Sequence, residues 1–333
     1  MKRLSDYAMN MREDAYHAKE CLSYSILAQY ERNGGFKWLP EKWSDLWLPT
    51  PKTEALVFGG AVDALLTDGV DEFNRRYKVV DIPAVQDRVK AVIDKMLIDG
   101  ILMTDTDRLF AVIEEVGFYP TWRRDTRINK LTVDGMAYYE ALKSCESKTL
   151  LTGETYEKVL KVCDDLRSSK LISKLMFDDL PKGQERFFQL QFATKFGGVL
   201  YKIMCDMVIV DHDKKTIHIY DLKTTGKESY SFPYSYLDWG YHIQSWLYRM
   251  VLEDAIIMTD YDGYKVDGFS FIVASKTSGE PCVWDDLTQL TGKKFRDPLV
   301  IGAEIVNSFD EDGNKKTMPE WCSSSKANVI RFE

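Results

Sequence analysis

The sequence has no closely paired cysteines, no long apolar run and no excess of basic residues. Its six cysteines are scattered without any C-x-x-C pair, which argues against a zinc or iron–sulfur site and favours reduced, buried thiols. No stretch is long and apolar enough to cross a bilayer, and the opening MKRLSD lacks the apolar core of a signal peptide. We therefore expect a cytoplasmic protein with no membrane partner.

The charge balance is acidic. A net charge of −8 argues against a protein that coats a polyanion over its whole surface, although a local basic groove or bound metal ions could still attract one. One basic cluster is present, formed by Arg123, Arg124, Arg127 and Lys130. Such a cluster is more often a solvated helix face than a binding site, so alone it is weak support for nucleic-acid binding.

What the chain does contain is enough apolar material for a sizeable core: 333 residues, 45% of them hydrophobic. Helical spacing of apolar residues dominates as far as residue 180. Ser23 or Ser25 is a plausible cap for the first of these helices. The helices predicted from this spacing cover residues 20–30, 55–67, 82–98, 104–116, 132–146 and 153–169.

The pattern then changes to that of a sheet. Residues 186–196 alternate apolar and polar side chains, Gly197-Gly198 forms a turn, and 199–210 is rich in Val, Ile and Met. After turn residues at 211–214, residues 216–223 form a third strand. A helix over 238–252 and a buried strand over 268–274 follow, whereas the last fifty residues are too weakly patterned to place. Helices followed by a strand meander indicate an α/β fold with a mixed sheet and a helical N-terminal half.

Ionisable residues stand out in two of these strands. The second strand is apolar or aromatic except for Lys202 and Asp206. In the third strand Asp221 and Lys223 share one face, because side chains alternate. Burying such groups without partners is costly. With only a short turn between the strands, Asp206 and Asp221 can converge on a single point, and Lys223 can reach the same point.

This set of residues suits metal-dependent hydrolysis. Two adjacent carboxylates repel each other unless a cation lies between them, and oxygen ligands suit Mg²⁺, with Mn²⁺ as a substitute. A bound metal would activate water and polarise a phosphate. Lys223 would orient the water or neutralise charge that develops on the phosphoryl oxygens. A D-x-K string also arises by chance in a charged chain, so Asp221-Leu222-Lys223 alone does not establish a site.

Asp206, fourteen intervening residues and then DLKTT resemble the D…(D/E)-x-K core of the PD-(D/E)xK nuclease superfamily. The string IYDLKTT is similar to that of the branch with RecB nuclease domains, lambda exonuclease and phage exonuclease VIII (RecE-like) proteins. Three outlying features agree with this branch. They are Glu185 ahead of the first strand, Gln244 and Tyr248 as a Q-x-x-x-Y motif, and S-x-S-x-L at residues 23–27.

The resemblance implies a restriction-endonuclease-like fold and a set of functional residues. The catalytic residues it implies are Asp206, Asp221, Lys223, Glu185, Gln244 and Tyr248. The metal ligands it implies are Asp206, Asp221, the backbone carbonyl of Leu222, and Asp63. Glu185 could instead be an edge-strand charge, and Gln244 and Tyr248 could simply pack and form hydrogen bonds.

One motif departs from the family pattern. Related proteins carry G-x-x-x-H, whose histidine helps to bind metal, whereas this chain has Gly59-Gly60-Ala61-Val62-Asp63. Aspartate can bind Mg²⁺, so Asp63 is either a harder replacement ligand or a helix-surface acid without a role. We expect two histidines to have structural rather than catalytic roles. His218 faces away from Asp221, and His242 is a lone histidine on a helix.

By resemblance, we expect one nuclease domain over 1–333, with a mainly helical part at 20–180, the catalytic sheet and helix at 181–280, and a C-terminal extension at 281–333. The implied function is a Mg²⁺-dependent exonuclease that acts on double-stranded DNA in phage recombination or end resection. Such a protein would work in the cytoplasm of a bacterium or phage-infected host, as a homo-oligomeric ring that cooperates with a single-strand annealing protein. The alternatives are an endonuclease or repair nuclease of the same fold, and an inactive DNA-binding or assembly protein.

Overall fold

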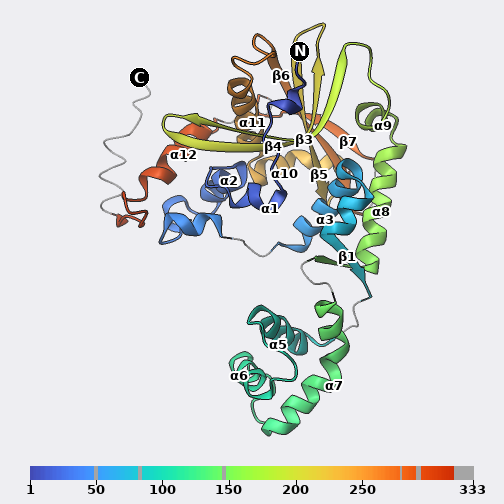
Figure 1. Ribbon diagram of the computed structural model, residues 1–333, viewed down its shortest axis with the longest axis vertical. Coiled ribbons are helices and arrows are strands. Elements are labelled where there is room, and N and C mark those ends of the chain that lie inside the picture. The colour runs from blue at the N-terminus through green and yellow to red at the C-terminus, as the bar shows by residue number, and fades with distance from the viewer. Residues whose placement is uncertain (49–51, 82–84, 145–147, 278–279, 290–293, 319–333) are drawn as a thin grey trace. The chain divides into compact units, whose positions relative to one another are not determined.

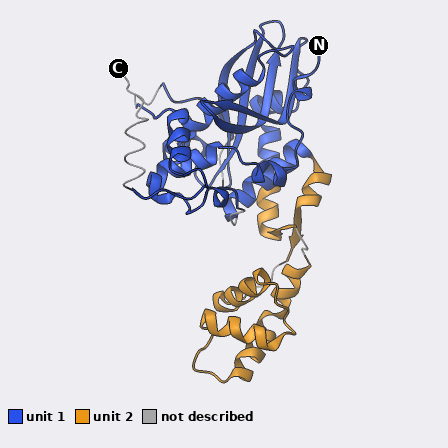
Figure 2. Cartoon of the chain, turned by 60° about the vertical axis from the view of Figure 1, so that its left-hand side comes forward, with its two compact units in different colours: residues 1–68, 161–333 blue, residues 69–160 orange. Residues whose placement is uncertain are grey.

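The computed structural model describes residues 1–48, 52–81, 85–144, 148–277, 280–289 and 294–318. The chain forms two compact units, Met1–Asp68 with Lys161–Glu333, and Gly69–Leu160 (Figure 2). The single nuclease domain expected over 1–333 stays a prediction. The second unit has an apolar cluster of its own, built from three helices that the sequence predicted.

The second unit contains a three-helix core and a short parallel strand pair, β1 with β2. Gly135 on α7 allows the helices to approach closely, because a Cβ at this position would lie 2.4 Å from Ile93 Cδ1 on α5. Leu109 and Ile113 of α6 complete this core. The elements are α4 (Val70–Arg76), β1 (Tyr77–Val80), α5 (Asp87–Ile98), α6 (Thr106–Val116), α7 (Arg124–Lys143), β2 (Thr149–Thr152) and α8 (Gly153–Ser168), which continues into the first unit.

The basic cluster of the sequence lies in this second unit and is used within it. Arg127 is 3% exposed, and its guanidinium donates to the carbonyl oxygen of Phe118 at 2.7 Å and pairs with Glu114. Arg124 pairs with Asp107, and Lys130 and Asp134 form a further ion pair at 2.7 Å. These contacts give most of the cluster a structural role rather than that of a free basic groove.

The first unit is organised around a five-stranded mixed sheet in the order β3-β4-β5-β6-β7 (Figure 1). Strands β3 to β5 form an antiparallel meander, β6 runs parallel to β5, and β7 is antiparallel to β6. This confirms the predicted fold class, including the meander. The strands are β3 (Gln184–Phe196), β4 (Val199–Asp211), β5 (Thr216–Thr225), β6 (Lys265–Ser275) and β7 (Cys282–Asp285).

Both predicted turns of the meander are confirmed. Gly197 and Gly198 have φ values of 54° and 89°, which suit a two-residue hairpin and leave Phe196 paired with Val199. In the next turn the Lys214 amide donates to Asp211 Oδ1 at 2.9 Å, which is the local bond expected of a turn aspartate.

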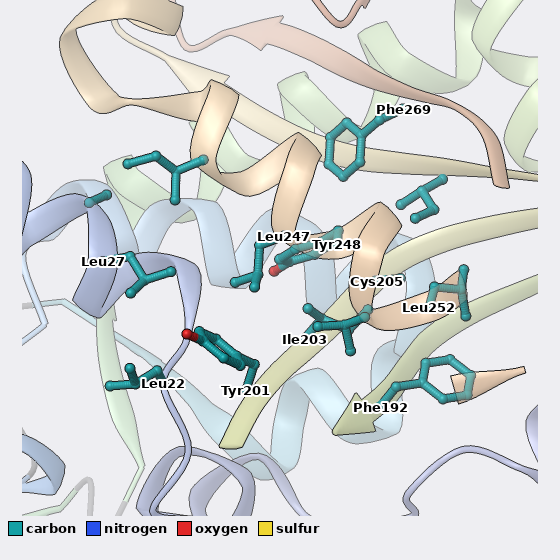
Figure 3. Packing of buried hydrophobic residues seen from close by; sticks show 14 of the residues in the cluster. Leu22, Leu27, Phe192, Tyr201, Ile203, Cys205, Leu247, Tyr248, Leu252 and Phe269 are labelled. Atoms are coloured by element: carbon teal, nitrogen blue, oxygen red, sulfur yellow. The ribbon is translucent and has the colours of Figure 1, made fainter. Parts of the chain in front are cut away.

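The helix between β5 and β6 differs from its predicted bounds. Gly240, with φ 70°, divides the segment into α10 (Phe232–Trp239) and α11 (Tyr241–Ala255), because a left-handed residue ends a helix. Helix α11 provides the crossover that parallel strands require. Its apolar face, which includes Leu247, packs against Ile203 and Cys205 of β4 in the main core (Figure 3).

Shorter helices complete the first unit. Ser23 occupies the N-cap of α2, but its hydroxyl is hydrogen-bonded to the Ser25 hydroxyl at 2.9 Å instead of to the backbone. The helices are η1 (Leu4–Asp6), α1 (Glu13–Ala18), α2 (Tyr24–Arg32), η2 (Gly35–Trp38), η3 (Trp43–Trp47), α3 (Glu54–Asp63), a π-helical turn η4 (Ala64–Asp68), α9 (Lys170–Met176), η5 (Ser229–Ser231) and α12 (Pro298–Asn307).

The C-terminal extension, which the sequence left unplaced, contributes β7 and α12 to the first unit. Ile301 and Ile305 of α12 are buried in its core. Gly302 lies against Tyr201, where a Cβ would come within 2.1 Å of the hydroxyl oxygen. Among the described residues Cys21, Cys163 and Cys205 are buried free thiols, while Cys145 and Cys322 lie outside them. No helix in the described part of the chain is long and apolar enough to span a membrane.

Candidate active site

Asp206 and Asp221 lie where β4 and β5 stop pairing. The final pair of the ladder toward this end is Met207 with Tyr220. The two aspartates lie one position beyond this pair, Asp206 just before Met207 and Asp221 just after Tyr220. The Leu222 amide donates to Asp206 Oδ2 at 2.8 Å. This bond joins the Asp206 carboxylate to β5 at Leu222, the residue that follows Asp221. The convergence expected from the short turn between the strands is therefore present in the structure.

Asp221 is buried at the site and is only 3% exposed. Its Oδ1 atom accepts a hydrogen bond from Gln244 Nε2 on α11 at 2.5 Å. Its Oδ2 atom contacts the Lys223 ammonium, which also lies 5.0 Å from the centre of the Tyr241 ring. The structure thus brings together three residues that the sequence nominated, from a strand and from the helix that follows it.

The charges at this site are unequal. Burial raises the pKa of Asp206 well above its usual range, and the nearby carboxylates of Asp221 and Asp63 raise it further. Burial works to lower the pKa of Lys223, but Asp221 and Asp206 outweigh it, so that this pKa lies above its usual value. Three carboxyl groups therefore act on one another near one protonated lysine. A cation bound between them would favour their ionised forms.

Asp63 is the last residue of α3, and its charge acts on Asp206. Its Oδ2 atom accepts a hydrogen bond from Gln189 Nε2 of β3 at 2.8 Å. The Thr67 hydroxyl donates to the Asp63 carbonyl oxygen at 2.9 Å, and it lies 3.3 Å from Oδ1. Because Asp63 also contributes to the raised pKa of Asp206, it is electrostatically part of the site and not a remote surface acid.

The donor set fits a hydrated Mg²⁺ or Mn²⁺ ion. Within the described residues, no three side chains of His, Cys, Asp or Glu are grouped so that they alone could hold a metal. Mg²⁺ is commonly bound through one or two carboxylates and retains several waters. Asp206 and Asp221 could provide these two carboxylates. Leu222 takes part through its amide, whereas the role of its carbonyl rests on the sequence resemblance.

Glu185 is not brought to the cluster, and its predicted place there is corrected. It pairs with Val210, four residues from Asp206, which corresponds to about 13 Å along a strand. Its carboxylate lies 3.6 Å from Arg3 Nε and 3.4 Å from His212 Nε2. The sequence misplaced it because β3 is long, and the residue that lies across from Asp206 is Gln189.

The two residues of the Q-x-x-x-Y motif lie on one face of α11, as predicted. Gln244 is 2% exposed and bonds Asp221. Tyr248 packs edge-on against Phe269. Burial raises the pKa of the Tyr248 hydroxyl well above its usual value, and Asp221 and Asp206 are among the charges that raise it further. The hydroxyl therefore stays protonated near the acids, where it can donate a hydrogen bond.

Lys202 of β4 and Tyr16 of the N-terminal segment lie beside the site, although the sequence assigned neither of them a role in it. Lys202, on the same strand as Asp206, is 3% exposed. Its ammonium donates to the carbonyl oxygens of Tyr16, His17 and Lys19 at 2.6, 3.0 and 2.8 Å. Burial raises the pKa of Tyr16, and Asp206 is among the charges that raise it further. An ionisable residue inside an apolar strand was the available signal for Lys202, but its partners could not be predicted.

The two histidines have the structural roles that the sequence suggested. His218 is on β5, next to Tyr220, and its Nε2 lies 2.8 Å from the Ser270 hydroxyl. The His242 ring stacks on Phe295 with ring centres 3.8 Å apart. Burial lowers the pKa of His242 to about 4, so its ring is neutral in the folded protein near pH 7.

This burial predicts an acid-dependent loss of stability. A histidine with a folded-state pKa of about 4 and an unfolded value of about 6.5 binds more protons when unfolded. The free energy of unfolding should therefore fall as the pH drops from about 6.5 to 4, by about 1–2 kcal/mol from this residue once solvent screening of its partly exposed ring is included.

Urea unfolding of wild type and His242→Phe at a series of pH values measures this effect. The phenylalanine can keep the stacking on Phe295 but cannot titrate, so the variant should lose less stability between pH 6.5 and 4. Above pH 7 the two proteins should show the same pH dependence. An identical slope in the acid range would contradict the assignment.

Comparisons with known proteins add little to this geometry. No family model matches the chain, and no curated protein matches it. Among solved structures, the chain is similar to a presumed exonuclease from Eubacterium rectale, with 13% identity, a TM-score of 0.43, and coverage of 99% of this chain and 88% of that one. A likeness this small carries no argument about function, so the site has to be interpreted from its own residues.

Proposed function

We propose that this chain is a metal-dependent deoxyribonuclease that hydrolyses phosphodiester bonds, with Asp206 and Asp221 as the carboxylates that hold Mg²⁺ or Mn²⁺. The observation that carries the proposal is the meeting of these two acids where the pairing of β4 with β5 ends, with the Lys223 ammonium in contact with Asp221. Burial raises the pKa of Asp206, and repulsion from Asp221 and Asp63 raises it further; a divalent cation would favour the ionised form of this carboxyl.

The residues of the chain divide the work as follows. When bound, the metal supplies Lewis-acid polarisation of the phosphate and an activated water. Lys223, whose ammonium contacts Asp221, orients the attacking water or stabilises negative charge on the phosphoryl oxygens. Gln244 fixes the orientation of Asp221, and the protonated hydroxyl of Tyr248 serves as a further hydrogen-bond donor.

The substrate we propose is double-stranded DNA attacked at its ends, as in phage recombination or end resection. We further propose a homo-oligomeric ring and cooperation with a single-strand annealing protein. These details rest on the resemblance of short motifs, such as IYDLKTT, to those of exonuclease VIII-like proteins, while the site itself supports only phosphodiester hydrolysis.

The decisive experiment is to incubate the purified protein with linear and with covalently closed circular DNA, in Mg²⁺ or in EDTA. We expect loss of linear DNA in Mg²⁺, intact circles, and no reaction in EDTA. The matched control is Asp221→Asn purified in parallel, which should be inactive and so excludes a contaminating nuclease. Cleavage of circles would replace the exonuclease with an endonuclease, and no cleavage in Mg²⁺ or Mn²⁺ would overturn the proposal in favour of a DNA-binding protein.

A further inference from the structure

Strand β3 contains a backbone irregularity directly beside the candidate site. Gln189 has a φ of 53°, although it lies in the middle of a thirteen-residue strand. The ladder pairs Phe188 with Met207 and Leu190 with Cys205, so Gln189 is the residue opposite Asp206, and this pair is missing from the ladder. A left-handed conformation is strained for a non-glycine residue, and no turn here requires it.

The side chain of Gln189 accounts for the irregularity. Its amide nitrogen donates to Asp63 Oδ2 at 2.8 Å and lies 3.4 Å from the Thr67 hydroxyl. Thr67 in turn donates to the Asp63 carbonyl oxygen from the π-helical turn Ala64–Asp68 that follows α3. Such turns are rare and are frequent at functional sites. The irregular part of β3 and the π-helical turn therefore both contact the Asp63 carboxylate, through Gln189 and Thr67.

We infer that Gln189 is a positioning residue that holds Asp63 beside Asp206 and Asp221, as an outer carboxylate that strengthens cation binding. The inference rests on the proposed metal site and adds to it a residue from β3. The sequence left open whether Asp63 is a metal ligand or a surface acid without a role, and the inference adds a third possibility. Asp63 need not be a direct ligand, because the described side chains form no three-residue metal group, but its charge still strengthens cation binding.

The chemistry of the glutamine amide fits this role. A neutral amide donor fixes the orientation of a carboxylate and leaves its negative charge in place. A lysine or arginine in the same position would neutralise Asp63 and repel a cation at the acid pair. The alternative is that the irregularity only bends or twists β3. In that case glycine would serve equally well at position 189, since it adopts this backbone conformation without strain.

The substitution Gln189→Gly separates the two interpretations, because it removes the amide and relieves the strain at the same time. We expect the melting temperature of the metal-free protein to stay the same or rise. We expect its Mn²⁺ affinity, measured by calorimetry, to fall about 10-fold, as outer-shell substitutions commonly cause. Met258→Gly is the matched control, since Met258 also has a positive φ of 60° and is 92% exposed. It should gain stability without any change in Mn²⁺ affinity.

Two further variants complete the test. Gln189→Asn tolerates the left-handed backbone but has a shorter side chain, so it should also bind Mn²⁺ more weakly. In the Asp63→Asn background, Gln189→Gly should cause little further loss, because both changes remove one interaction. Unchanged Mn²⁺ affinity in Gln189→Gly would overturn the positioning role alone. Absence of Mn²⁺ binding by the wild type would instead overturn the proposed metal site and the inference together.

Discussion

Lys223→Ala is expected to slow DNA cleavage by about 10²–10³-fold, the usual effect of removing one group that stabilises transition-state charge. The dissociation constant for DNA should change by less than about 3-fold, because most affinity comes from phosphate contacts spread along the duplex. The structural basis is the position of the Lys223 ammonium on Asp221 and against the Tyr241 ring, at the convergence of the acids. Single-turnover rates and binding isotherms on one preparation measure both quantities.

Lys227→Ala is the matched control for this prediction. Lys227 follows the same strand, but its side chain is 58% exposed and lies 4.0 Å from Asp238, away from the acid pair. Its removal should leave the cleavage rate close to that of the wild type. Cleavage by Lys223→Ala at the wild-type rate would remove Lys223 from the mechanism, whereas an equal loss in binding and in rate would make it a DNA contact.

Asp206→Asn is expected to abolish measurable Mn²⁺ binding and cleavage and, in EDTA, to make the protein more stable. The amide oxygen of asparagine can still accept the hydrogen bond from the Leu222 amide, so the local geometry is kept. What disappears is a carboxyl group whose pKa is raised by burial and by the charges of Asp221 and Asp63. Without a cation such a group costs folding stability above its unfolded pKa, because it must either stay charged in the interior or bind a proton on folding. A gain of about 1 kcal/mol would raise the melting temperature by roughly 2–4 °C.

Thermal unfolding in EDTA and Mn²⁺ calorimetry on the same samples check both parts of this prediction. Glu185→Gln is the control. Glu185 is also an acid of this sheet, on β3, but its carboxylate forms ion pairs with Arg3 and His212. It should keep wild-type Mn²⁺ affinity and gain no stability. If Asp206→Asn melts below the wild type in EDTA, the acids are not in mutual repulsion. If it retains Mn²⁺ affinity, Asp206 is not a ligand.

Much of the catalytic sheet follows from short-range sequence patterns. The alternation around Phe188 to Phe192 and the apolar run after Gly198 predict the first two strands within two residues of their observed starts. Asp221 and Lys223 share a face because they are two residues apart on one strand, and Gln244 and Tyr248 do so because they are four apart on one helix. Each of these relations depends only on the geometry of a single element.

The sequence failed where the answer depends on how elements are arranged. Glu185 looked suitable because it precedes the strand, but the register of β3 against β4 places it opposite Val210 and gives the position opposite Asp206 to Gln189. Likewise, the helices of Gly69–Leu160 were predicted one by one, yet only their shared apolar cluster shows that they form a separate unit.

The sequence by itself determined the strand meander, the pair Asp221 and Lys223, and the approach of Asp206 through a short turn, because local hydrogen bonding and side-chain periodicity fix these relations. The tertiary structure alone decided that Gln244 bonds Asp221, that Gln189 holds Asp63, and that Lys202 anchors the segment carrying Tyr16. These contacts join residues 23 to 186 positions apart in the chain. Their formation depends on which faces pack together to bury the core, and no local pattern encodes that choice.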